Sequence, residues 1–108
     1  MGGLSERIIE APVIPVGSHT QVTNATLASA QTLTAPSDCD GILWQNIGTQ
    51  NISFTIDGTT PTATKGFLLF PTTEPRVVTV GGGITLKVIR VASGAALDYV
   101  WCRSYSEG

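Results

Sequence analysis

Short stretches of β-forming residues, separated by turn residues, recur along most of the chain, and this rhythm limits the possible folds most strongly. From residue 20 onward Thr, Val, Ile and aromatic residues dominate, and turn residues recur about every eight to twelve positions. No stretch sustains a helical period. The chain is therefore predicted to be all-β: an antiparallel β-sandwich or jelly-roll-like barrel of about eight short strands with an extended N-terminal arm. The candidate strands are residues 20–27, 31–35, 42–47, 51–56, 67–70, 76–80, 84–91 and 96–103.

Three of these stretches alternate apolar and polar residues, as strands do when one face is buried. The apolar stripes are Ile52, Phe54 and Ile56; Ile84, Leu86 and Val88; and Leu97, Tyr99 and Trp101. In 84–91 the phase slips at Ile89 and Val91, which indicates either a bulge near Val88–Arg90 or burial on both faces. The aromatic rings that lie in apolar strand patterns are expected in the core: Trp44, Phe54, Phe67, Phe70, Tyr99 and Trp101.

The separators between the strands have the composition of turns. Gly48-Thr49-Gln50 links two candidate strands at hairpin length, and Ser93-Gly94 predicts a hairpin between the last two. The run Gly81–Gly83 permits a positive φ and a tight reversal.

Residues 1–19 differ from the rest of the chain. Pro12 and Pro15 favour extended backbone, and the surrounding residues show no period. We expect an extended N-terminal arm (1–19) that docks on a partner subunit, followed by a single β-sandwich domain (20–108); a disordered terminus is the alternative. The arm residues expected to bind the partner are Ile8, Ile9, Val13, Ile14 and Val16.

The chain carries little charge. Charged residues make up 13% of it, about half the usual 25%, which suits either a protein covered by neighbours or a surface rich in uncharged polar residues. The net charge is −2 and the basic residues are scattered, so nucleic-acid binding is not expected. No apolar run reaches the ~20 residues of a membrane-spanning helix, and charges interrupt the N-terminus where a signal peptide is apolar. We expect synthesis in the cytoplasm.

Cys39 and Cys102 are the only cysteines, and they lack the spacing of a metal or redox pair. They are expected to be small buried hydrophobic residues, with a disulfide between them as the alternative.

No arrangement of residues indicates catalysis, a cofactor or a metal. His19 is the only histidine and stands at the junction of arm and domain, where a general base is poorly held. The candidate carboxylates are mostly in predicted turns, where Asp bonds its own backbone; they are Asp38, Asp40, Asp57, Glu74 and Asp98, the last of which lies in a candidate strand. The segment Asp38–Gly41 resembles a calcium loop but lacks the downstream bidentate Glu. An enzyme is therefore not expected, and neither is a cofactor.

One segment resembles a known class of proteins. Residues 42–70 contain a strand, a GTQN turn, a strand ending in DGTTPTATKG (Asp57–Gly66) and an apolar strand. This pattern, preceded by Thr34-Ala35-Pro36, resembles small phage-encoded virion structural proteins in which an LTAP phrase is followed by DGTxPTAxxG. The resemblance covers roughly residues 25–104. Within the loop, Asp57 is expected to accept hydrogen bonds from Thr59 or Thr60.

The resemblance implies a virion location and a structural role. The preferred hypothesis is a capsid decoration or cement protein that binds the assembled head non-covalently, contacts the major capsid protein or other virion subunits, and forms a homo-oligomer, with a trimer favoured. The alternatives are a tail- or fibre-associated adaptor or receptor-binding β domain, and a carbohydrate-binding module with exposed coplanar aromatic rings.

Overall fold

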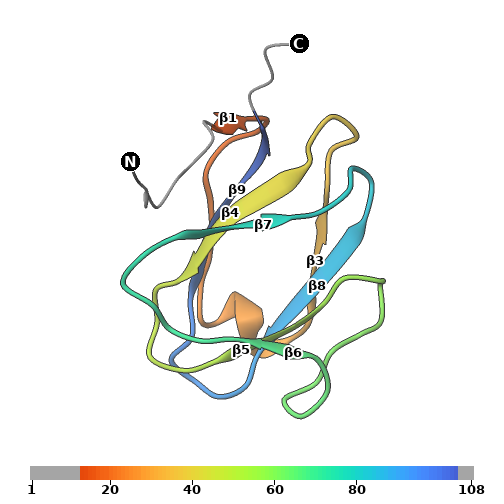
Figure 1. Cartoon of the computed structure of the whole chain (residues 1–108). Helices are drawn as coiled ribbons and strands as arrows, with labels where there is room; N and C mark the ends of the chain where they lie inside the picture. The colour runs from red at the N-terminus through yellow and green to blue at the C-terminus, as the bar shows by residue number, and fades with distance from the viewer. Residues whose placement is uncertain (1–12, 105–108) are drawn as a thin grey trace, which may run out of the picture.

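The computed structural model describes residues 13–104, which form nine β-strands and one 3₁₀ helix (Figure 1). The all-β prediction is confirmed. The elements are β1 (Val13–Pro15), β2 (Thr20–Val22), the 3₁₀ helix η2 (Thr26–Ala28), β3 (Gln31–Thr34), β4 (Gly41–Asn46), β5 (Ile52–Thr55), β6 (Phe67–Leu69), β7 (Arg76–Thr79), β8 (Thr85–Arg90) and β9 (Leu97–Ser104).

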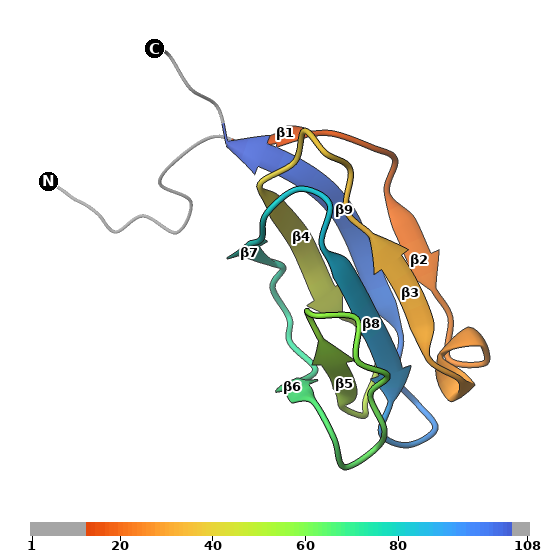
Figure 2. The ribbon, with the colours of Figure 1, turned by 90° about the vertical axis from the view of Figure 1, so that its right-hand side faces the viewer.

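The strands form two antiparallel sheets that face each other as a sandwich (Figures 1 and 2). One sheet has the order β1-β9-β4-β7, with β2 also pairing with β9, and the other has the order β3-β8-β5-β6. Strands β2 to β9 therefore form two four-stranded sheets, 2-9-4-7 and 3-8-5-6, which is the strand order of a jelly roll.

Most connections pass from one sheet to the other. Between β2 and β9, only β5 and β6 follow each other in the chain and also pair. The hairpins predicted at Gly48–Gln50 and Ser93-Gly94 are therefore wrong, because each of these turns links strands of different sheets. The two crossovers contact each other instead: the Thr49 amide donates to the Gly94 carbonyl at 2.8 Å. A Cβ on Gly48 would lie 2.2 Å from that same oxygen, so the close approach requires glycine.

The core lies between the sheets and is formed largely by the predicted stripes. Leu86 and Val88 of β8 are buried, as are Leu97 and Trp101 of β9. The stripe of Ile52, Phe54 and Ile56 is buried at Ile52, but Ile56 at its end is half exposed. Strand β8 pairs with β3 and β5 in regular register up to Arg90, so the phase slip reflects partial burial on the outer face and not a bulge.

The sheet begins earlier than the predicted boundary at residue 20. Strand β1 pairs with the end of β9, with Val13 opposite Ser104 and Ile14 opposite Arg103. The Val16 amide donates to the Trp101 carbonyl at 2.8 Å, and the Val16 side chain packs against the core. The described part of the predicted arm is thus an edge of this chain's own sheet.

Candidate interaction surface

The two lateral sides of the sandwich differ in how their edges are covered. Figure 2 shows β6 and β7 along one side, and β2 and β3 along the other. Strand β7 is the outer strand of one sheet, and β6 is the outer strand of the other. We call the β6–β7 side the open edge, and its exposed apolar residues are Phe67, Leu68, Phe70, Val77 and Val78.

The exposure of these residues is large for apolar side chains. Phe67 is 65% exposed and Phe70 is 58% exposed, while Leu68, Val77 and Val78 are 45%, 39% and 37% exposed. A fully exposed aromatic side chain presents about 150–250 Å², so the two rings alone leave roughly 200–300 Å² uncovered. The largest apolar patch on a typical monomer is about 300–600 Å² in total and is often functional. The open edge is therefore a candidate interaction surface.

Two of these exposed side chains project from the inner faces of the sheets. Phe67 lies opposite Phe54, and Val78 lies opposite the fully buried Ile42. Residues directly opposite each other in an antiparallel pair share a face. The core itself therefore reaches solvent at this edge: the ring centroids of Trp44 and Phe54 are 4.9 Å apart, and those of Phe54 and Phe67 are 5.7 Å apart.

Side-chain amides of β4 hold the open edge in place. Asn46 is fully buried, and its Nδ2 donates to the carbonyls of Leu69 at 2.9 Å and Gln50 at 2.8 Å. Its Oδ1 accepts from the Gly48 amide at 3.0 Å. Gln45 Nε2 donates to the Thr72 carbonyl at 2.8 Å. Polar groups thus anchor a segment that has little apolar packing of its own.

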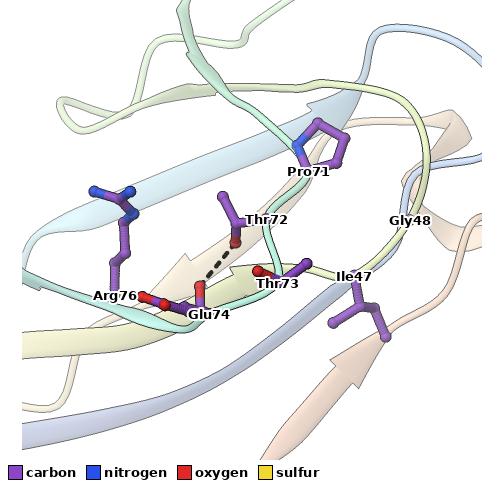
Figure 3. A pocket seen from close by; sticks show the side chains of 7 residues that line it. All are labelled: Ile47, Gly48, Pro71, Thr72, Thr73, Glu74 and Arg76. Carbon is purple, nitrogen blue, oxygen red and sulfur yellow. Dashed lines mark hydrogen bonds between the residues drawn. The ribbon is translucent and has the colours of Figure 1, made fainter.

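A wide-mouthed hollow of about 700 Å³ adjoins the open edge (Figure 3). Its wall includes Glu74 and Arg76, two side chains of opposite charge, and the Thr72 hydroxyl donates to the Glu74 carbonyl at 2.8 Å. The remaining lining residues are Ile47, Gly48, Pro71, Thr72 and Thr73. This composition offers hydroxyl groups and a balanced charge, without a nucleophile beside a base.

The DGTTPTATKG segment forms an ordered loop beside β5. The Asp57 carboxylate accepts from the Thr59 amide at 3.0 Å, as the sequence predicts. This hydrogen bond, helped by the Thr59 side chain, lowers the pKa of Asp57 below 3.8. Ser53 of β5 donates its hydroxyl to the Lys65 carbonyl at 2.8 Å, the Thr55 hydroxyl donates to the Thr59 carbonyl, and Pro61 is buried. The loop therefore covers polar residues of β5 and presents hydroxyl groups outward.

The structure separates the predicted partner-binding residues. Ile8 and Ile9 lie outside the described residues. Val13 and Ile14 are half-buried in β1, and Val16 packs on the core of its own domain. The structure thus places Val13 and Ile14 in an edge strand of the domain and Val16 just after it.

The polar candidates for chemistry do not gather into a site. His19 Nε2 lies 3.4 Å from Asp98 Oδ2 at the surface, and Gln21 Nε2 donates to Asp98 Oδ1 at 3.0 Å. Arg90 donates to the Asn24 carbonyl at 3.1 Å. Within residues 13–104, no group of three or more His, Cys, Asp or Glu side chains could hold a metal ion.

Both cysteines are buried and free. Burial raises the pKa of each thiol above 9.0, and the neighbouring Asp40 carboxylate raises that of Cys102 further. The prediction of buried hydrophobic cysteines is confirmed.

The prediction that the aromatic rings in apolar strand patterns lie in the core is only partly right. Trp44 and Trp101 are buried, but Phe67 and Phe70 are the most exposed large apolar residues among those described. The sequence does not reveal the open edge, because the continuous apolar run FLLF (67–70) is typical of a buried core strand. A usable signal was present in Pro71 and Pro75, since proline beside a strand is typical of sheet edges.

Comparisons with protein-family models, curated proteins and solved structures found no match to this chain. In the part of the chain that the structure describes, no helix is long and apolar enough to cross a membrane.

Proposed function

We propose that this chain is a structural protein of a phage virion, and specifically a decoration or cement protein that binds the assembled head without covalent attachment. The observation that carries the proposal is the open edge: a large apolar surface on a domain whose chain is only 13% charged. Such a surface suits a protein that functions while covered by neighbours.

Two further observations support this role. The DGTTPTATKG segment, which resembles the virion proteins, is a loop without net charge that is hydrogen-bonded to β5 through Ser53 and Thr55. The jelly-roll strand order is one that viral capsid domains use. That likeness concerns the fold alone, because the same fold serves lectins and cupins as well.

The mechanism follows from mass action. A protein that binds only the assembled shell raises the stability of that shell, and contacts made by several linked copies add avidity. The contacts are to the major capsid protein or other virion subunits. Apolar area buried in them contributes about 25 cal/mol per Å². Ile8 and Ile9 of the N-terminal segment supply one part of this apolar area.

A sugar-binding role has less support. The two exposed phenylalanines are accompanied by Leu68, Val77 and Val78. A sugar platform combines exposed rings with side chains that hydrogen-bond sugar hydroxyls. The apolar surroundings favour a protein partner.

The proposal is tested by mixing the purified protein with purified heads and measuring co-sedimentation and thermal disruption of the heads. We expect the wild type to bind and to raise the disruption temperature. The double substitution Ile8→Asp/Ile9→Asp should weaken binding, whereas Thr32→Lys, an exposed change on β3, should not. Label found only at the tail in electron micrographs would contradict decoration and support the adaptor alternative.

A further inference from the structure

We infer that the open edge is the surface through which copies of this chain associate with one another. This assignment rests on the proposed function, which expects a homo-oligomer, and it adds the face at which the copies meet. A neighbouring copy brings its own β6 and β7 against those of the first, around a shared symmetry axis.

Strands β6 and β7 each pair on one side only, β6 with β5 and β7 with β4. Strands β2 and β3 are edge strands as well, but none of the exposed large apolar residues among those described lies on them. All four residues of β7 are exposed. Two sheet edges that end unpaired on the same side of a domain, with apolar side chains around them, promote uncontrolled association unless something covers them. A symmetric contact covers the edges of both copies at once and then ends the assembly.

The composition of the open edge suits contact between copies. Homo-oligomer interfaces are more apolar than transient ones, and aromatic residues are enriched at their centre. The open edge has Phe67 and Phe70 beside three exposed aliphatic residues, and Arg76 of β7 is a charged residue within it.

The charges in and beside the open edge are of both signs. Arg76 lies in β7, and Lys65 and Glu74 each precede one of its two strands by two residues; all three are exposed. When two identical surfaces meet, a patch of one sign repels its copy, but a margin of both signs permits opposite charges to pair. This margin therefore favours a second copy over a partner of strong single-sign charge.

The exposed area of the open edge also bears on which partner can cover it. A stable interface takes about 800 Å² from each partner. Phe67 and Phe70 supply roughly 200–300 Å² of that area, and the adjoining Pro71 and Pro75 are also exposed. A second copy presents an open edge of the same size.

The test is the molar mass of the full chain in solution, measured by light scattering and sedimentation over a dilution series without any phage particle. We expect the wild type to be a dimer or trimer. Phe67→Ser on β6 and Val77→Lys on β7 should each convert it to a monomer at concentrations where the wild type is assembled. Thr32→Lys, which adds the same charge at an exposed position of the opposite edge strand β3, should leave the mass unchanged.

Folding of each variant is checked through the fluorescence of the buried Trp44 and Trp101. A monomeric wild type, or an oligomer that survives both substitutions with native fluorescence, would overturn the inference. The substitution Ile8→Asp/Ile9→Asp should also leave the mass unchanged; a monomer in that case would assign the contact to the N-terminal segment. Because particle binding is measured separately, loss of the self-contact and failure of the proposed function are distinguishable.

Discussion

The two lateral sides of this sandwich differ in how much of the core is covered by the chain itself. On the β2–β3 side, which we call the closed side, the connecting segment places Leu27 of η2 in the core with no exposure, beside the buried Val22 and Leu33. On the open edge, the segment between β6 and β7 contains Pro71 and Pro75 and contributes no such plug.

Polar contacts differ between the sides as well. On the closed side, the Asn24 carboxamide accepts from the Gly94 amide at 2.7 Å, and its amide nitrogen lies 3.3 Å from the Ser93 hydroxyl. These bonds supplement an apolar plug. On the open edge, the buried Asn46 anchors β6 where no plug exists. On the closed side, the chain itself covers the core. On the open edge, hydrogen bonds hold β6 in place, but exposed apolar side chains remain uncovered.

The largest expected effect on stability comes from making the same Leu→Ala substitution on each side and comparing the two losses. Leu27→Ala should lower the free energy of unfolding by about 2–5 kcal/mol, because it removes buried methyl groups and leaves a cavity. Leu68→Ala, at a residue that is 45% exposed, should change it by less than about 0.5 kcal/mol in the monomer. Urea unfolding in a Val77→Lys background measures both values, and equal losses would show that the sides do not differ.

A smaller effect is expected when the polar anchors are compared. Asn46→Ala should lower the free energy of unfolding by about 2–3 kcal/mol, because buried backbone carbonyl and amide groups lose their hydrogen-bond partners. Asn24→Ala, at a half-buried position, should cost about 1 kcal/mol. Denaturation curves give the totals. Hydrogen exchange should show faster opening of β6 in the Asn46 variant alone, and unchanged exchange there would rule out the anchoring role.

The smallest effect concerns the loop beside β5. The pKa of Asp57 is lowered by its hydrogen bond from Thr59, so the charged form is favoured in the folded state. Its contribution to stability is present above pH 3.8, the unfolded value, and is lost as the pH falls through the lower folded value. NMR titration of the Asp57 carboxyl should give a midpoint below 3.8; a midpoint at or above that value would contradict the hydrogen-bonded loop.

Much of the fold was predictable because local rules decide it. Alternation identified Leu86, Val88, Leu97 and Trp101 as inward-facing residues, and turn chemistry identified Asp57 as a backbone acceptor. The hairpin predictions failed because a turn of given length can join neighbours in one sheet or cross between two. The choice depends on which strands bury their faces together, and that information is not local.

The exposure of the open edge also depends on non-local packing and cannot be predicted from local sequence rules. An all-β chain with little charge, alternating core strands and an apolar N-terminal segment follows from the amino-acid sequence alone. The exposure of Phe67 and Val78, which project from inner faces, follows only from how the two sheets are packed. The physical reason is that burial depends on the opposing sheet. Strands β6 and β7 are the outermost strands of their sheets, so the sandwich ends beside them and part of its core stays exposed.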